Sequence, residues 1–348
     1  MVLKFRCLLA SDVDWLTESA NDPEVAKYSI SVYPITEHEV GEWVKKDLDE
    51  GSSKYIVAEM DGEPAGELSL WLRSGAGKDR HVAWLGIAVR RKFWGKGVGA
   101  GLINEAIGLS KKSGCKRVML GTIEGNERAI RLYGKFGFRT EAYESKEVYI
   151  DGSWRNSFIM GLELAPCEPK VAQASMSKDK RPKTSNRKKT CVRQALNRDL
   201  DELNRLQNCS ESAKSTWLLP PVTKEETKKW YEKLNSDQGK YCLVCARGTK
   251  LLGYLHFKVS HLPFPSVKFE EILVDVEQEP DKTAGALVEA IEGFRVRYGY
   301  RRIFAYAPET SDAIVDALAS RGFRQNGAMK DYYFIDGHYV NVAVFAYP

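Results

Sequence analysis

The residues best suited to chemistry form a glycine-rich loop. Three alternating glycines, Gly95, Gly97 and Gly99, stand between the apolar run 84–89 and a helical pattern that begins near Ala100. Glycine lets the backbone approach a ligand closely, because no Cβ blocks the way. A helix start adds unpaired N–H donors and the positive end of the helix dipole. The loop therefore predicts an anion site suited to phosphate or pyrophosphate, with a ligand-free tight turn as the alternative.

A second motif follows the loop. The apolar run 117–123 predicts another strand, and Asn126, Ala129, Leu132 and Tyr133 then recur at helical spacing. The loop itself is neither of two common phosphate loops. No Gly-Lys-Ser/Thr follows it, and its glycines do not have the Gly-x-Gly-x-x-Gly spacing.

These two motifs together resemble those of the GNAT superfamily of acyl-CoA-dependent N-acetyltransferases. The family loop, Gln/Arg-x-x-Gly-x-Gly/Ala, is matched by residues 94–99, with Trp94 where Gln or Arg is usual. The family's second signature, Asn-x-x-Ala-x-x-Leu-Tyr-x-x-x-Gly-Phe, matches residues 126–138 without a gap. The resemblance covers roughly residues 3–165. It implies an N-acetyltransferase that moves an acetyl group from acetyl-CoA to a primary amine by direct attack in a ternary complex.

The resemblance also implies a cofactor site. The backbone of Ile87, Ala88 and Val89 would receive the pantetheine arm like an added strand, beside a central strand that bulges away from its neighbour. Asn126 would hydrogen-bond the cofactor, and Tyr133 would lie near the sulfur as general acid, with simple helix packing as the alternative for Tyr133. The pyrophosphate would lie on Trp94, Gly95, Lys96, Gly97, Val98, Gly99 and Ala100.

Acetyl transfer also needs a group that removes a proton from the amine, because an ammonium ion cannot attack. The departing CoA thiolate must gain a proton as well. Three residues on or beside the strands expected at the slot are candidates for the base. We favour Glu124 and Glu67 over His81, which stands at the start of a strand.

Three aromatic residues are candidates for the acceptor site. Tyr28 lies in the connection between two predicted helices, and Tyr149 and Trp154 flank a predicted hairpin turn. Packing without a substrate role is the equal alternative for each. The acceptor itself, whether a small-molecule amine or a peptide or protein amine, is not encoded in any recognisable motif.

The surrounding pattern predicts the elements that position these groups. A first strand near residues 4–9 is followed by a helix from about Asp12, and a second helix begins at Thr36, whose capping box includes Glu39. Strands 55–59 and 66–71 meet at an Asp-Gly turn. The expected fold is α/β, a mostly antiparallel mixed sheet flanked by helices.

Length and composition limit the possible classes. The chain has 348 residues, enough for two domains, and no apolar run of membrane-spanning length. We expect a soluble, cytoplasmic protein without membrane contact. The seven cysteines are scattered, and Cys242 and Cys245 lie in a strand-like run where positions three apart point to opposite faces. Core packing is therefore favoured over a metal site.

The positive charge is concentrated in one segment. The chain carries a formal charge of +5, but residues 166–189 hold eight Lys/Arg against two Asp/Glu, a net of +6 that leaves −1 for the rest. This segment is poor in bulky apolar residues, and we interpret it as a flexible basic linker. A nucleic-acid-binding patch at 178–189 is the less favoured alternative.

After the linker the chain repeats itself. Residues Asp12 and Trp43 recur as Asp199 and Trp230 at an offset of 187, and Gly137 recurs as Gly322 at 185. A near-constant register predicts two tandem copies of one fold, residues 1–165 and 190–348. The second copy is degenerate, because the chemical positions are lost. At the later offset Gly95, Gly97 and Gly99 become Pro280, Lys282 and Ala284, Asn126 becomes Ser311, and Tyr133 becomes Leu318.

Two function hypotheses follow. The first is an acetyl-CoA-dependent N-acetyltransferase with an active first domain, without a metal ion, as a monomer or homodimer. The alternative is a non-catalytic acyl-CoA sensor, which would bind the cofactor without turnover. The retained Tyr133 favours the enzyme, because a sensor has no need of a proton donor.

Overall fold

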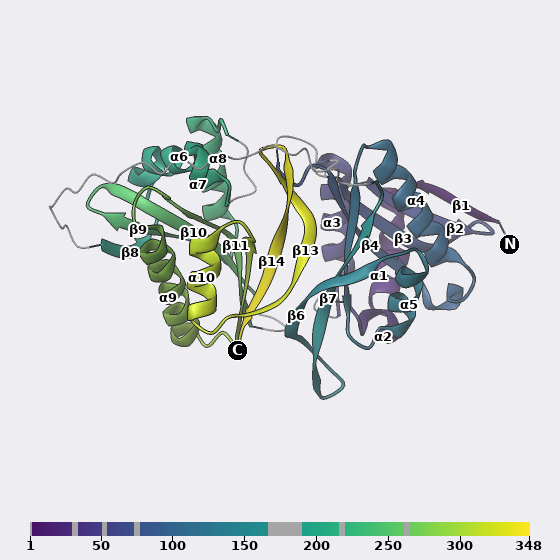
Figure 1. The fold of residues 1–348 in the computed structure, drawn as a ribbon. Coiled ribbons are helices and arrows are strands. Elements are labelled where there is room, and N and C mark those ends of the chain that lie inside the picture. The colour runs from purple at the N-terminus through teal and green to yellow at the C-terminus, as the bar shows by residue number, and fades with distance from the viewer. Residues whose placement is uncertain are drawn as a thin grey trace. The chain divides into compact units, whose positions relative to one another are not determined.

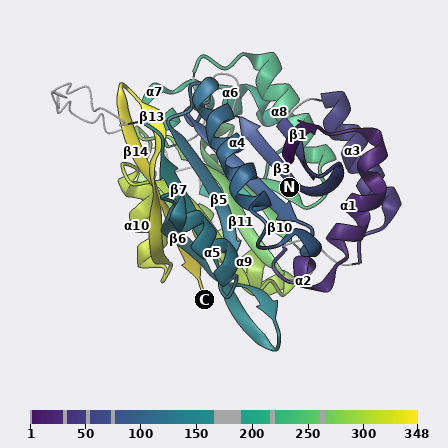
Figure 2. The ribbon, with the colours of Figure 1, turned by 90° about the vertical axis from the view of Figure 1, so that its right-hand side faces the viewer.

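The computed structural model describes residues 2–29, 34–50, 54–72, 77–165, 190–215, 220–260 and 265–348 (Figures 1 and 2). The predicted basic linker, 166–189, lies outside these residues. The described residues form two compact units. The first holds residues up to 72 and 79–165, and the second holds 77–78, 190–260 and 265–348.

The first unit is a mixed sheet with helices on both faces. Its strand order is β1-β2-β3-β4-β5-β7-β6, and every neighbouring pair is antiparallel except β4 with β5. The mainly antiparallel α/β fold expected from the sequence is thus confirmed. The strands are β1 Leu3–Cys7, β2 Lys54–Met60, β3 Glu63–Leu72, β4 Val82–Val89, β5 Arg117–Ile123, β6 Arg139–Ile150 and β7 Ser153–Glu163. The helices are η1 Ala10–Asp12, α1 Val13–Ala20, α2 Pro23–Ala26, α3 Glu37–Glu50, η2 Arg91–Phe93, α4 Val98–Lys112 and α5 Glu127–Lys135.

Strand β2 shows why helices cover both faces of this sheet. Its side chains alternate, as the period of two along a strand requires. Tyr55 and Val57 pack with Leu16 of α1 and Val40 of α3. Ala58 belongs to the core on the other face, together with residues of α4 and α5. The site residues of β4, α4 and α5 are therefore built on this second core.

The local signals in the sequence form the predicted turns and caps. Asp61 and Gly62 have φ of 52° and 86°, the two positive values of a type I′ hairpin turn between β2 and β3. The Thr36 backbone N–H donates to Glu39 at 2.8 Å, and the Glu39 N–H donates to the Thr36 hydroxyl oxygen at 3.2 Å. These reciprocal bonds are the predicted capping box at the start of α3.

The second unit has its own sheet, ordered β8-β9-β10-β11-β12-β14-β13, in which β11 and β12 form the parallel pair. Two cores lie on its two faces. Cys242 packs with helices α6 and α8, whereas Cys245 packs against α9, so the two thiols lie on opposite faces of β9. The strands are β8 Thr190–Gln194, β9 Lys240–Arg247, β10 Lys250–Ser260, β11 Ser266–Val274, β12 Arg302–Pro308, β13 Arg324–Ile335 and β14 His338–Tyr347. The helices are η3 Asn197–Asp199, α6 Leu200–Asn208, α7 Ser210–Ala213, α8 Lys224–Ser236, α9 Pro280–Tyr298 and α10 Asp312–Ser320.

Several contacts occur in both units at equivalent sequence positions. The Arg6–Asp12 ion pair, at 2.7 Å, has a counterpart in Arg193–Asp199, at 2.6 Å. These positions are separated by the same offset of 187. In the described part of the chain, no helix is both long and apolar enough to cross a membrane.

Candidate active site

The two parallel strands of the first unit separate halfway along β4. Their paired register runs from Val82↔Arg117 to Leu85↔Leu120, while β4 continues to Val89. The ladder between β3 and β4 has no register shift, so the strands separate without the bulge expected from the resemblance. Beyond Leu85, the described residues offer β4 no strand partner on its β5 side. This free edge comprises Gly86, Ile87, Ala88 and Val89, all partly exposed.

The glycine loop leads from this edge into helix α4. Gly95 and Gly97 have φ of 75° and 87°, in the left-handed region that favours glycine, and Gly97 is the N-cap of α4. No side chain caps the helix, and its first turn carries no acidic residue. The N–H groups of Val98, Gly99 and Ala100 have no carbonyl partner within the helix because of their position. The start of α4 therefore fits an anionic phosphate.

Trp94 ties the glycine loop to the end of β4. Its indole N–H donates a hydrogen bond to the backbone oxygen of Val89, at 2.7 Å. The guanidinium carbon of Arg128 lies 3.3 Å from the centroid of the Trp94 ring, within stacking distance. Arg128 belongs to the first turn of α5, so its positive charge lies beside the loop. Lys96 adds a second exposed cation on the loop itself.

Helix α5 carries the second motif. The side chain of Asn126 accepts a hydrogen bond from the Ala129 N–H at 3.3 Å and so caps the helix, which leaves its amide NH₂ free to donate. Tyr133 is 6% exposed, and burial raises the pKa of its phenol to about 12. Within the described residues the Tyr133 hydroxyl has no hydrogen-bond partner. The phenol is therefore protonated at neutral pH and available as a donor.

Glu67 differs from the other two candidate bases. It lies on β3 opposite Ala88 of β4 and is partly buried. Its carboxylate accepts a hydrogen bond from the Tyr55 hydroxyl at 2.6 Å. Burial raises the pKa of Glu67 to about 7, although the Tyr55 bond opposes this shift. A carboxylate with this pKa can accept a proton near neutral pH.

Glu124 and His81 occupy less suitable positions. The Glu124 carboxylate accepts the Asn156 backbone N–H at 3.0 Å, and the Glu124 N–H donates to the Asn156 oxygen at 2.9 Å. These bonds extend the ladder between β5 and β7. His81 immediately precedes β4, at the end of the strand opposite Val89.

Tyr28 and the β6–β7 hairpin are linked through their neighbours. The Tyr28 hydroxyl donates to the backbone oxygen of Gly125 at 2.9 Å, directly beside Asn126. The adjacent Lys27 pairs with Asp151 of the hairpin turn at 2.5 Å. Tyr149 and Trp154 lie next to that turn, with ring centroids 5.2 Å apart. The aromatic residues expected at the acceptor site therefore lie on two connected segments.

Sequence reasoning missed three residues of this arrangement. Tyr55 donates a hydrogen bond to Glu67 that partly offsets the rise of its pKa by burial, Arg128 stacks on Trp94, and Lys27 holds the hairpin through Asp151. Each contact joins elements distant in sequence, so only a known sheet register could have revealed it. Among the described residues, no group of three or more His, Cys, Asp or Glu side chains could hold a metal ion.

Comparison with known proteins identifies the first unit. Residues 16–138 match the acetyltransferase (GNAT) family. The L-amino acid N-acetyltransferase AaaT of Escherichia coli is 26% identical over 150 residues, which are 43% of this chain and 90% of that protein. The spermidine N(1)-acetyltransferase of the same organism is 27% identical over 166 residues, 45% of this chain and 84% of that protein. The solved yncA structure from Salmonella typhimurium, with acetyl-CoA, has a TM-score of 0.42 and 21% identity, covering 50% of this chain and all of that one.

The first unit is thus an acyltransferase domain. Residues 16–138 match the GNAT family, and through this domain the chain is an enzyme, an acetyl-CoA-dependent acyltransferase similar to these N-acetyltransferases. The family match ends at Phe138, so it does not extend into the second unit.

Proposed function

We propose that the first unit transfers the acetyl group of acetyl-CoA to a primary amine by direct attack in a ternary complex. The observation that carries this proposal is the separation of β4 from β5 beside the uncapped start of α4. The free edge of β4 provides backbone groups for a pantetheine arm, and the start of α4 provides donors for its pyrophosphate. The exposed cations Lys96 and Arg128 add attraction for phosphate.

The reaction needs two proton transfers, and the unit has a group for each. The amine nitrogen forms a bond to the thioester carbon, and the carbon–sulfur bond breaks. Glu67 accepts the proton of the amine, because its raised pKa makes it a competent base near pH 7. Tyr133 gives its proton to the departing thiolate and regains one from solvent. Glu124 has a structural role instead, since its carboxylate accepts a hydrogen bond from the Asn156 backbone N–H.

The acceptor is a primary amine on a small molecule or peptide. The relatives that support this class are named for L-amino acids, spermidine and the alanine of ribosomal protein uS5. Tyr28, Tyr149 and Trp154 border the acceptor side in this proposal, because Lys27 and Asp151 join their two segments.

The second unit is a degenerate copy that does not bind acetyl-CoA. At the offset of 185, the start of α4 at Val98 corresponds to Thr283, yet α9 already begins at Pro280. A helical turn therefore occupies the place of the glycine loop. The carboxylate base and the phenol donor are also replaced, since Glu67 corresponds to Tyr254 at the offset of 187 and Tyr133 to Leu318 at 185.

The test is release of CoA from acetyl-CoA over a panel of amino acids, polyamines, aminoglycosides and short peptides. Mass spectrometry should find an N-acetylated product with one acceptor class. Binding of acetyl-CoA without turnover on any acceptor would contradict the enzyme and favour the sensor hypothesis. Absence of acetyl-CoA binding would contradict both.

A further inference from the structure

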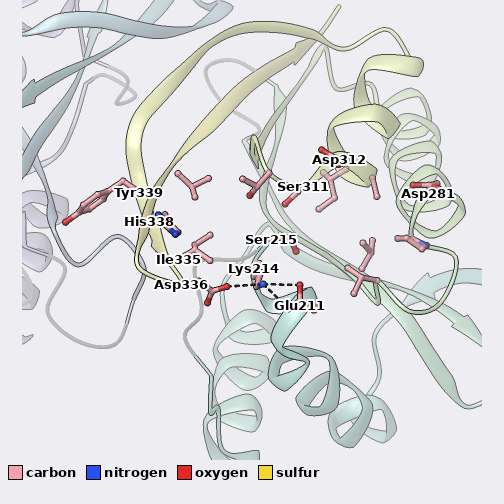
Figure 3. A pocket seen from close by; sticks show the side chains of 17 residues that line it. Glu211, Lys214, Ser215, Asp281, Ser311, Asp312, Ile335, Asp336, His338 and Tyr339 are labelled. Atoms are coloured by element: carbon pink, nitrogen blue, oxygen red, sulfur yellow. Dashed lines mark hydrogen bonds and ion pairs between the residues drawn. The ribbon is translucent and has the colours of Figure 1, made fainter. Parts of the chain in front are cut away.

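The second unit contains a cavity of about 810 Å³ between its sheet and three of its helices (Figure 3). Segments from α7, the end of β11, the starts of α9 and α10, and the β13–β14 hairpin line it. Much of its wall is apolar, including Val274, Ile314, Ile335, Tyr339 and Val340. Such a volume is in the range of small-molecule sites.

The cavity lies where the first unit has its proposed substrate site. Lys214 is part of its lining and pairs with Asp336 of the hairpin turn at 2.9 Å. This pair corresponds to Lys27 and Asp151 of the first unit at the offsets of 187 and 185. The same bond between helix and hairpin thus shapes both places, although the chemical groups around them differ.

The lining excludes the phosphates of acyl-CoA. Pro280 and Asp281 stand where the first unit has Gly95 and Lys96, so a rigid turn with a negative charge replaces the phosphate loop. The positions of Glu67 and Tyr133 hold Tyr254 and Leu318, so neither the carboxylate base nor the phenol donor keeps its place. The cavity therefore fits a ligand that is bound and not acetylated.

The charge of the lining favours a cation. The lining contains four carboxylates and one ammonium, which gives a formal net charge of −3. The carboxylates are those of Glu211, Asp281, Asp312 and Asp336, and the ammonium is that of Lys214. The starts of α9 and α10 add about half a positive charge each, which still leaves about −2. Lys214 engages Glu211 and Asp336, both at 2.9 Å, whereas Asp281 and Asp312 form no ion pair with any described residue.

One hydroxyl in the cavity is also available to a ligand. Ser311 is the N-cap of α10, but its side chain makes no capping hydrogen bond, unlike Asn126 at the start of α5. Among the described residues, the Ser311 hydroxyl has no hydrogen-bond partner. The hydroxyl stands beside Asp312 and can accept a hydrogen bond from an ammonium group.

We propose that this cavity is a non-catalytic binding site for an aliphatic diamine or polyamine. The apolar walls take the methylene chain, and Asp281, Asp312 and the Ser311 hydroxyl take the ammonium groups. The site would make the second unit responsive to the amine concentration. The inference does not depend on turnover in the first unit, because equilibrium binding alone tests it.

The test is calorimetric titration of the full chain with spermidine and with hexamethylenediamine, in the absence of acetyl-CoA. Hexanediol, the neutral counterpart of the diamine, should not bind measurably. Replacing both free carboxylates, D281N with D312N, should weaken diamine binding at this site roughly tenfold. Added salt should weaken binding to the parent as well, since the lining is open to screening.

A matched variant separates the cavity from general surface charge. E277Q with D316N removes two exposed carboxylates from neighbouring segments outside the cavity and should leave the affinity within about twofold. A313W places a large side chain in the cavity from the surface of α10 and should abolish binding there. An A313W chain that binds as many diamines as the parent, or equal weakening by the two charge variants, would overturn the proposal, because an acceptor site in the first unit accounts for no more than one of them. So would the absence of diamine binding to the parent chain at millimolar concentrations.

Discussion

At the scale of single residues, the pKa of Glu67 controls the proposed reaction. Burial raises this pKa to about 7, and the hydrogen bond from Tyr55 partly offsets the rise. The carboxylate must be ionised to accept a proton, so kcat/KM should fall tenfold per pH unit below about 7. Y55F removes a bond that favours the ionised form, and its inflection should therefore move to higher pH. An unchanged inflection in Y55F would contradict the role of Glu67.

A companion substitution tests which carboxylate is the base. E67Q should lower kcat/KM at pH 8 about a hundredfold or more, the usual contribution of a general base. E124Q should keep the inflection near pH 7 in the pH–rate profile, because Asn156 and not the substrate engages that carboxylate. A loss of the inflection in E124Q would identify Glu124, and not Glu67, as the base.

Trp94 offers a second prediction at this scale. W94F removes the N–H that holds the Val89 carbonyl and keeps a ring on which Arg128 can stack. A neutral hydrogen bond contributes about 1 kcal/mol, so KM for acetyl-CoA should rise about fivefold with kcat nearly unchanged. W94L, which also removes the stack, should raise KM further. Steady-state kinetics at saturating amine would measure both, and a fall in kcat alone would contradict a positioning role.

At the scale of elements, the start of α4 depends on backbone conformation. A Cβ at Gly97 would meet nothing within 4 Å, but its φ of 87° disfavours any other residue. G97A should cost about 1 kcal/mol of unfolding free energy and weaken acetyl-CoA binding. G108A, in the same helix and equally open, should instead stabilise the protein by about 0.5–1 kcal/mol. Thermal unfolding of both variants, with and without acetyl-CoA, would measure this difference. Equal shifts of the unfolding temperature in G97A and G108A would contradict the prediction.

The elements also show which contacts can be predicted from the sequence. The Asp61–Gly62 turn and the Thr36–Glu39 capping box involve residues within three positions of each other, so local chemistry determines them. The Tyr55 hydrogen bond to Glu67 joins two strands, and Arg128 of α5 meets Trp94 of the glycine loop. These contacts depend on register and packing, for which a single sequence carries no direct signal. The motifs located the site, while its proton chemistry required the fold.

At the scale of the whole molecule, the proposal gives the two units different tasks. Among the described residues, positive-φ glycines precede the uncapped start of α4 in the first unit, whereas Pro280 begins a helical turn at the corresponding place of the second. Calorimetry should therefore find one acetyl-CoA per chain. G97A should weaken that one site, and A313W in the second unit should leave it unchanged. Two equal sites would contradict a degenerate second unit.

The most direct test of the account is the effect of Y133F on turnover. The substitution removes the buried hydroxyl and keeps the ring that packs against Phe138, with centroids 6.0 Å apart. We predict that kcat falls about a hundredfold or more while calorimetry finds acetyl-CoA bound as tightly as before. Y143F, at an exposed tyrosine of β6 that has no role in the proposed site, is the matched control for proton donation and should keep most of kcat. A Y133F enzyme with the parental kcat would show that the buried phenol does not protonate the thiolate.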